Sequence, residues 1–534
     1  MISNPPLPLR RSRLLDVAER IGNALPDPAL LFVFAMLLLA VASAYAAAAG
    51  WSAVNPVTGE ALQARSLLTE ASVAQLLGEL PRTYAGFAPL GVVLTVVLGA
   101  GVADGSGLFA ALLRASLRHA PARLLTPAVL LVGMLTCHAS DAGYLVYVPL
   151  AGVVFAAAGR HPVVGIVTGF AGVAVGLAGN LLPGQYDVLV LGITETGARL
   201  VDPQWRMNPL GNWWFSLATA LAFTTLGALV IERVVAPRFG RWTGGVLPLA
   251  ASPAAAPGPG LGSAADSPGA IDADRERRGL RAAGLAALAV FALFAALATW
   301  PGYTPLYDES AAPAQRITPL YRSLPAAFFL LFTATGWAYG AATGSIRSHR
   351  DVVAMMARGL EGMVPYLVLV FFAALFVAMF ANSNLGPLLA IHGAATLKDL
   401  QAPPALLLPV LTTLSSWLDF LIASGSAKWT AMAPVATPML MLLGISPEMT
   451  TAAYRIGDTV TNLVSPLNPY IVLVLAYGRR WMPELRLGTL LAATLPLALA
   501  FYLAGVLLVI AWVALGLPVG PGATVAYHLP GAAP

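Results

Sequence analysis

The chain has little charge and almost no cysteine. Only 10% of its 534 residues are charged, against about 25% in soluble proteins, and 58% are hydrophobic. Cys137 is the single cysteine, which excludes an internal disulfide and shows no metal-ligand spacing. A His-Glu zinc motif, a Gly-x-Ser-x-Gly elbow and a pair of membrane aspartates in protease spacing are also missing. These absences argue against a soluble domain and rank an intramembrane enzyme last. The net charge of +5 fits basic cytoplasmic loops better than a nucleic-acid surface.

What the chain does contain is a long series of apolar runs, each long enough to cross a bilayer as a helix. We predict an all-α polytopic membrane protein with about nine transmembrane helices. Two longer apolar stretches, about 124–158 and 404–445, are interrupted by small polar residues and are interpreted as re-entrant helical hairpins. The spans are expected at about 29–50, 88–113, 163–196, 211–235, 281–301, 326–344, 361–382, 450–478 and 485–516.

The placement of arginines orients these spans, because cytoplasmic loops carry an excess of basic residues. The arginines assigned to the cytoplasmic side are Arg114, Arg118, Arg123, Arg160, Arg347, Arg350, Arg479, Arg480 and Arg486. The amino terminus is then inside and the carboxyl terminus outside. Four arginines fall on external loops and run against the bias: Arg65, Arg82, Arg316 and Arg322.

The sequence is expected to divide into six segments. They are an N-terminal helix with an external loop (1–87), a first repeat with a hairpin (88–235), a flexible cytoplasmic linker rich in Ala, Pro and Gly (236–279), connecting scaffold helices (280–360), a second repeat with a hairpin (361–516) and a C-terminal tail (517–534).

The two halves of the chain look alike. Tyr144 and Trp429 each precede a proline by five residues, and GNLLPGQYDVLVLG around Asn180 matches TNLVSPLNPYIVLVLA around Asn462. Each half can be drawn as helix, hairpin, broken helix and helix, with opposite orientations in the membrane. Chance similarity between two stretches rich in small residues is the alternative. The agreement of order, break and topology favours an inverted-topology repeat, in which paired interrupted helices mark the binding site of a transporter.

The most informative segment is 443–470, because it places Arg455 and Asp458 inside an apolar run. A charged side chain near the bilayer centre costs about 2.5–3.5 kcal/mol on insertion scales. At a spacing of three residues the two side chains share a helix face, so one interpretation is a self-satisfied ion pair. The functional alternative gives Arg455 a substrate carboxylate and leaves Asp458 to bind a proton or Na⁺.

Prolines that interrupt helices lie on both sides of Arg455 and Asp458. Pro447 and Pro466 are predicted structural breaks, which end or kink helices and shape a cavity. Asn180 and Asn462 lie at the two interruptions and are candidates for substrate contact. Backbone groups freed by such breaks persist at membrane depth only where protein or a water-filled cavity satisfies them.

The second hairpin has a small, polar tip with the sequence SGSAKW. Ser426 lies where a half-helix begins, and such an amino terminus can hold an anion. Trp429 either stacks on a substrate ring or belongs to an interfacial belt. Lys428 is read as a snorkelling anchor or, less favoured, as a second cation for the substrate. Asp419 either pairs with Lys428 or another cation, or acts as a protonatable site.

In the first half, Asp187 follows the broken segment 180–184 and is the stronger candidate for ion coupling. Asp141 lies at the tip of the first hairpin beside His138. This pair suggests a proton relay or a structural hydrogen bond, and the sequence does not separate the two.

Combined, these motifs resemble the AbgT family of p-aminobenzoyl-glutamate transporters over nearly the whole length. The matching segments are GFAPLGVVL from Gly86, GRHPVVGI from Gly159, the NLL…D…LGIT pattern, SGSAKW, LGISPE, AAYRIGDTVTN and the terminal GLPVGPGA. The AAYRIGDTVTN and SGSAKW segments are specific in combination. The family's important positions fall here on Asp187, Ser426, Trp429, Pro447, Arg455, Asp458 and Pro466.

The resemblance implies a homodimer whose protomers each have nine spans, two hairpins and a solvent-filled bowl open to the cytoplasm. It also implies import of p-aminobenzoyl-glutamate, or export of sulfonamide drugs, driven by Na⁺ or H⁺. Many relatives carry Asn where this chain has Asp419, and SGSAKW replaces the more usual SASAKW. The extra carboxylate would favour H⁺ coupling.

We therefore predict a secondary active transporter of the bacterial inner membrane that moves a small anionic aromatic substrate. It would be coupled to Na⁺ or H⁺, with no enzymatic activity, no cofactor and no nucleic-acid partner. The alternatives are a proton-driven sulfonamide exporter on the same fold and, with less support, a channel.

Overall fold

The computed structural model describes residues 28–117, 124–139, 143–242, 273–310, 316–361, 363–401, 403–420, 422, 424–465, 468 and 470–528. Several sequence predictions lie outside these residues: the cytoplasmic arginines Arg118 and Arg123, the hairpin-tip residue Asp141, the break at Pro466 and most of the linker, 243–272. The described chain is mostly helical, as predicted.

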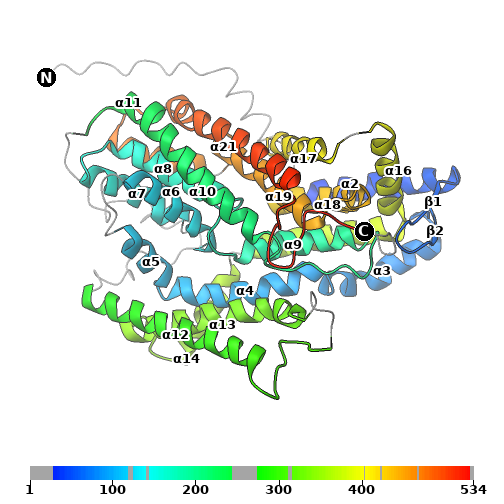
Figure 1. The fold of residues 1–534 in the computed structure, drawn as a ribbon, viewed down its shortest axis with the longest axis horizontal. Coiled ribbons are helices and arrows are strands. Elements are labelled where there is room, and N and C mark those ends of the chain that lie inside the picture. The colour runs from blue at the N-terminus through cyan, green and yellow to red at the C-terminus, as the bar shows by residue number, and fades with distance from the viewer. Residues whose placement is uncertain are drawn as a thin grey trace.

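One group of helices forms a frame at the side and end of the molecule. It comprises α2 (Pro28–Ala48), α3 (Glu70–Ala85), α4 (Ala88–Gly105), α5 (Leu108–Leu117), α12 (Ala273–Thr299), α13 (Thr318–Thr343), α14 (His349–Glu361), α15 (Val364–Asn382) and α16 (Leu385–Asp399). Helices α12, α13 and α14 lie along α4 and α5 (Figure 1). Small residues permit this close packing, as is usual between membrane helices. A Cβ atom on Gly99 of α4 would lie 2.6 Å from the carbonyl oxygen of Phe329.

The remaining helices come from two stretches with the same order. The first contains α6 (Leu125–Leu135), η2 (Thr136–Ala139), η3 (Gly143–Tyr147), α7 (Val148–Ala157), α8 (Pro162–Val175), α9 (Gln185–Ala198), α10 (Trp213–Val230), η4 (Ile231–Val235) and α11 (Ala236–Phe239). The second contains α17 (Pro404–Leu418), α18 (Gly425–Leu442), α19 (Pro447–Val460), η8 (Thr461–Leu463), α20 (Tyr470–Trp481) and α21 (Leu487–Leu515).

The two stretches pack crosswise. Helices α6 and α7 lie against α8 of their own half, and α7 also meets α20 of the other half. In the same way α17 and α18 lie against α19, and α18 packs along α9. A continuous core, which includes Val129 and Phe170 from one half and Ile456 and Leu497 from the other, joins them. Each hairpin-like pair therefore rests on pieces of both interrupted helices.

Both predicted interruptions are present. Helix α8 ends at Val175 and α9 begins at Gln185, while α19 ends at Val460 and α20 begins at Tyr470. Glycine makes the first of these regions compact, since a Cβ on Gly176, where the gap begins, would lie 2.6 Å from the carbonyl oxygen of Met134.

Among the described residues, length and apolar composition qualify five segments as membrane spans: Glu70–Gly105, Trp213–Phe239, Asp274–Thr299, Thr318–Thr343 and Leu487–Leu515. A sixth is the pair His349–Glu361 and Tyr366–Asn382, which is bent by 55°. The other three predicted spans correspond to α2 and to the interrupted pairs α8–α9 and α19–α20. Helices α6, α7 and α17 are shorter, and their re-entrant path across a membrane remains a prediction.

Several boundaries differ from the sequence prediction. The expected span 88–113 stops at Gly105, because Gly107 turns the chain with a φ of 87° before α5 begins. The predicted external loop contains helix α3 and a two-stranded antiparallel hairpin, β1 (Ser52–Val54) and β2 (Ala61–Gln63). The strands are only three residues long and α3 has a mixed composition, so the sequence analysis did not separate them from the loop.

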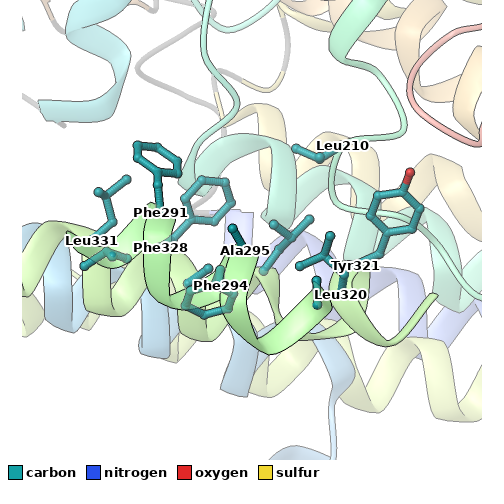
Figure 2. A pocket seen from close by; sticks show the side chains of 12 residues that line it. Leu210, Phe291, Phe294, Ala295, Leu320, Tyr321, Phe328 and Leu331 are labelled. Carbon is teal, nitrogen blue, oxygen red and sulfur yellow. The ribbon is translucent and has the colours of Figure 1, made fainter. Parts of the chain in front are cut away.

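A cavity of about 280 Å³ lies between α12, α13 and Leu210, which belongs to the connection between α9 and α10. Phe291 and Phe294 of α12 and Phe328 of α13 line it, and the Tyr321 hydroxyl is the polar group among the labelled side chains (Figure 2). A hydrocarbon-lined cavity of this kind does not suit a charged substrate.

Candidate functional site

Arg455 joins the two interrupted helices. It lies in α19, and its Nη1 is 2.7 Å from Oδ1 of Asp187, in the first turn of α9. Its Nε and Nη2 donate to the carbonyl oxygen of Leu177, at 2.8 and 2.6 Å, in the gap between α8 and α9. Both charged side chains are buried, with 2% and 7% of their area exposed. The ion pair therefore bridges the breaks of both halves.

This pairing corrects one alternative of the sequence analysis, in which Arg455 pairs with Asp458. The break after α8 lets α9 begin beside α19, which presents Asp187 to the guanidinium. Asp187 is also fixed from its own side, because its Oδ2 accepts a hydrogen bond of 2.7 Å from the backbone N–H of Gly184. A carboxylate at a helix amino terminus is stabilised there.

A second buried cluster surrounds Lys428 of α18. Its Nζ lies 2.9 Å from Oδ1 of Asp419 and 2.9 Å from Oδ1 of Asp458. The same ammonium donates to the carbonyl oxygen of Ser415 at 3.2 Å. The Lys428 side chain is 0% exposed, so the favoured interpretation of this lysine as a snorkelling anchor is wrong. The predicted alternative, that Asp419 pairs with Lys428, is confirmed.

Asp458 therefore already has a cationic partner, Lys428. The functional alternative of the sequence analysis had left this carboxylate to bind a proton or Na⁺. The Asp458 carboxylate lies at the amino terminus of α18, since a Cβ on Gly425 would be 2.6 Å from Asp458 Oδ2. The anion expected at this half-helix terminus is, in this structure, a side chain of the protein itself. Ser424 caps the helix by accepting from the Ala427 N–H at 3.3 Å, and Ser426 Oγ lies 3.3 Å from Ser424 Oγ.

Two tyrosines complete the cluster and were missed by the sequence analysis. The Tyr186 hydroxyl donates to Asp458 Oδ2 at 3.0 Å across the two halves. The Tyr454 hydroxyl lies 2.5 Å from the Gly425 carbonyl oxygen and 3.2 Å from Asp458 Oδ1. A signal was available: Tyr186 precedes Asp187, and Tyr454 stands one helical turn before Asp458.

Trp429 is fully buried, which excludes an interfacial belt position. Its ring stacks on Tyr454 with centroids 4.2 Å apart, and its Nε1–H donates to Thr194 Oγ1 at 2.8 Å. Thr194 in turn lies 2.7 Å from Thr451 Oγ1. This chain of contacts ties α18 to α9 and α19, so in this structure Trp429 holds the site together and is not open to a ligand.

Replacing Trp429 with phenylalanine is expected to weaken this junction while keeping the ring stack. Hydrogen bonds between membrane helices contribute about 0.6 kcal/mol on average and up to about 1.7 kcal/mol. We expect a loss in that range, measured as unfolding of the purified protein in mixed micelles. A Thr194→Val variant should lose a similar amount, and the double variant should lose little more than either single variant. Additive losses would contradict a shared bond.

The other predicted residues have local roles. Asn180 Nδ2 donates to the Met134 carbonyl oxygen at 2.7 Å and lies 2.8 Å from Cys137 Sγ, which ties the break to α6. Asn462 Nδ2 donates to the carbonyl oxygen of Asp458 at 3.2 Å. Pro447 occupies the first turn of α19 after the cap residue Ser446, so it starts this helix.

A cavity of about 240 Å³ adjoins these clusters. Leu177 and Tyr186 form part of its wall, and these residues contact Arg455 and Asp458 respectively. Its other lining residues come from α4, from the region of the first hairpin, from α8 and α9, and from the connection between α14 and α15; they are Val93, Val97, Cys137, Tyr144, Val173, Gln185, Leu189 and Met363. The cavity therefore lies between the frame and the first interrupted helix.

Comparison with known proteins identifies the family. A family model described as the AbgT putative transporter family matches residues 13–527. The chain belongs to the AbgT transporter family. It is 34% identical over 526 residues to the p-aminobenzoyl-glutamate transport protein of Escherichia coli (strain K12), covering 98% of both chains. The predicted family, the transport role and the location as a multi-pass inner-membrane protein are thereby confirmed.

Two solved AbgT-family structures share the fold. The YdaH transporter of Alcanivorax borkumensis is 38% identical, with a TM-score of 0.83 over 93% of this chain and 100% of that one. MtrF of Neisseria gonorrhoeae, described as illuminating a class of antimetabolite efflux pumps, is 35% identical. Its TM-score is 0.85 over 96% of this chain and 100% of that chain.

Proposed function

We propose that this AbgT-family protein is a secondary active transporter that moves p-aminobenzoyl-glutamate across the inner membrane, coupled to a Na⁺ or H⁺ gradient. The similarity to the E. coli transport protein supports the substrate class. The two carboxylates and aminobenzoyl ring of that substrate need a cation and an aromatic-lined cavity. We further propose that the protein acts as a homodimer.

The observation that carries this proposal is the position of Arg455. A guanidinium matches a carboxylate in two-pronged geometry, and here it lies behind the cavity wall formed by Leu177. Its present acceptors, Asp187 and the Leu177 carbonyl oxygen, both belong to the first interrupted helix. A substrate carboxylate would take the place of one of these acceptors.

That exchange supplies a mechanism for alternating access. A ligand shifts a conformational equilibrium only as far as it binds the two states differently. When the Asp187 carboxylate holds Arg455, α9 and α19 are joined; when a substrate carboxylate holds it, α9 is released. The hairpins α6–α7 and α17–α18 would then move with their interrupted helices past the frame.

The aromatic ring of the substrate would occupy the cavity beside Tyr144 and Tyr186. Tyr144 stacks on Tyr470 with ring centroids 3.9 Å apart, so one ring of the cavity wall packs against the second half. Aromatic side chains suit such a ring because offset or edge contacts add to the apolar area buried.

The single cysteine provides a direct test, because Cys137 lines the cavity. In membrane vesicles, saturating p-aminobenzoyl-glutamate is expected to slow maleimide labelling of Cys137 several-fold, while glutamate alone leaves the rate unchanged. A Cys137→Ser variant measures background labelling, and urea-denatured protein should label at one rate with or without substrate. An unchanged labelling rate at saturating substrate would place the ligand elsewhere.

Similarity to MtrF favours a second candidate, proton-driven export of sulfonamide antimetabolites through the same site. A sulfonamide that mimics aminobenzoate carries the ring but lacks the glutamyl carboxylates. Cells that express the chain should then tolerate more sulfonamide than cells carrying an empty vector. Equal drug tolerance together with substrate uptake would favour import.

A further inference from the structure

A second polar cavity lies at the other end of α8 from the break that holds Arg455. Its volume is about 640 Å³, within the range of about 300–1,000 Å³ that is usual for small-molecule sites. Arg160 and His161, from the connection between α7 and α8, line it together with Glu232 of η4 and Arg241, which follows α11. Helices α8, η4 and α11 meet at this end of the molecule (Figure 1). The proposed transport cycle does not involve these residues.

Two arginines face each other in this cavity. The backbones of Arg160 and Arg241 pair as an isolated antiparallel bridge, so their side chains leave the backbone on the same face. Residues opposite each other in such a pair have Cβ atoms about 4.5–5.5 Å apart, and like charges in these positions are destabilising. Because both side chains line the cavity, an anion bound there would relieve this repulsion.

A single carboxylate neutralises one of the two charges. Glu232 Oε1 lies 2.6 Å from Arg160 Nη2 and also accepts a hydrogen bond from the Thr126 hydroxyl. Arg160 is fixed further, since its Nη1 donates to Thr126 Oγ1 at 2.8 Å and its guanidinium lies 4.5 Å from the centre of the Phe155 ring. Glu232 is the only acid among the lining residues that the structure describes. Two arginines and one carboxylate therefore leave one positive charge in excess, at Arg241.

His161 adds a donor without adding a charge. Burial lowers the pKa of its imidazole, so the ring is neutral at pH 7. Its Nδ1 accepts a hydrogen bond of 3.3 Å from the Val163 N–H, which assigns the proton of the neutral ring to Nε2. The lining thus supplies two guanidinium groups and one imidazole N–H. Arginine binds phosphate oxygens with paired N–H donors, so this set suits a phosphate group.

The cavity lies at the level expected for lipid headgroups. The span Trp213–Phe239 ends beside it. The His161 ring lies 5.3 Å from the ring of Phe239 and 5.4 Å from that of Trp242, which in turn contacts Trp481 at 5.8 Å. Tryptophans gather at membrane interfaces, and the arginines here belong to the side predicted to be cytoplasmic. Anionic lipids of that leaflet bind in basic pockets between transmembrane helices.

We propose that this pocket binds a phosphate group between Arg160 and Arg241, and that its position favours the headgroup of an anionic phospholipid over free phosphate. Glu232 competes with the ligand for Arg160 and so weakens its binding. A bound headgroup would join the amino terminus of α8 to α11. The carboxyl end of α8 leads to Leu177, which accepts from Arg455, so the lipid would anchor one end of the interrupted helix at the membrane surface.

The test is thermal unfolding of the purified full-length protein in a non-ionic detergent after removal of bound lipid. Phosphatidylglycerol, phosphatidylcholine and inorganic phosphate are added in separate arms at equal ionic strength. We expect phosphatidylglycerol to raise the unfolding midpoint of wild type by several degrees, because a ligand that binds the folded state stabilises it. Phosphatidylcholine, whose headgroup has no net charge, should leave the midpoint unchanged.

Three variants make the result specific to the cavity. Arg241→Gln changes an exposed residue and should lose most of the response to phosphatidylglycerol. Arg233→Gln removes the same charge from an exposed residue of η4 that does not line the cavity, and it should respond as wild type does. Glu232→Gln removes the competing carboxylate and should reach half-maximal stabilisation at a several-fold lower concentration of phosphatidylglycerol.

The outcomes distinguish the two sources of phosphate. A response to phosphatidylglycerol alone that requires Arg241 identifies the headgroup as the ligand. A response of lipid-free protein to inorganic phosphate that requires Arg241 supports the site and identifies free phosphate instead. Equal responses of Arg241→Gln and Arg233→Gln, a wild-type response that phosphatidylcholine matches, or no response to either phosphate source would overturn the proposal.

Native mass spectrometry covers the case in which lipid stays bound through purification. Arg241→Gln should then retain one phosphatidylglycerol fewer than Arg233→Gln, and equal numbers would also overturn the proposal. Neither measurement needs a transported substrate. Failure of the proposed transport activity is therefore distinguishable from failure of this site.

Discussion

Replacing Arg455 with alanine is expected to abolish uptake of radiolabelled p-aminobenzoyl-glutamate, to below a hundredth of the wild-type rate. The variant loses the guanidinium proposed to hold the substrate carboxylate and also leaves Asp187 buried without its cation. Breaking a buried ion pair from one side costs about 3–5 kcal/mol, because the remaining charge is uncompensated. Uptake and the amount of inserted protein must therefore be measured together.

Two matched variants separate binding from folding. Arg455→Ala/Asp187→Asn removes both charges, so it should insert and unfold much as wild type does while still failing to transport. Arg455→Lys keeps the charge but loses the fork that reaches both Asp187 and the Leu177 carbonyl oxygen, and it should retain only weak uptake. Uptake near the wild-type rate by the neutral double variant would remove Arg455 from the site.

Replacing Asp458 with asparagine is expected to stop accumulation against a gradient. The change leaves Lys428 and Asp419 as a neutral pair, so the excess negative charge that a coupling cation would neutralise is lost. Accumulation in proteoliposomes under an imposed cation gradient should fall at least tenfold. Exchange of labelled for unlabelled substrate without a gradient should be affected less, since it requires no net movement of the coupling ion.

Tyr186→Phe serves as the matched control for that experiment. It removes the hydroxyl that donates to Asp458 Oδ2 but keeps the carboxylate and the ring in the cavity wall. Coupling should survive, with a shifted pH dependence of uptake. Undiminished gradient-driven accumulation by Asp458→Asn would reject a coupling role for this residue.

The sequence predicted the family, the two interruptions and most spans, because these depend on local patterns. A run of apolar residues is readable by itself, and so is its interruption around Asn180 or Asn462. The segments that the sequence analysis missed, such as α3 and the β1–β2 hairpin, have short or mixed patterns. They pack against α15 and α16, which are distant in the sequence, and no local pattern records such contacts.

The pairing of charges was less predictable. Sequence spacing offered a pair of Arg455 with Asp458, three residues apart on one helix, as one of two interpretations, yet each found its partner on another element. In a buried site, the partner of a charge is decided by which helix ends meet in space. Here the crosswise packing brings α9 and α18 against α19 and presents Asp187 and Lys428 to it. Only the hypothesis that Asp419 pairs with Lys428 anticipated part of this arrangement.

Counterflow in proteoliposomes tests the central claim most directly, namely that the two interrupted helices form one substrate site with alternating access. Vesicles loaded with unlabelled p-aminobenzoyl-glutamate, with no cation gradient, should take up labelled substrate transiently and faster than empty vesicles. Arg455→Ala/Asp187→Asn should abolish this stimulation. Flux that ignores internal substrate, or that is the same for wild type and the double variant, would contradict the account and point to a channel.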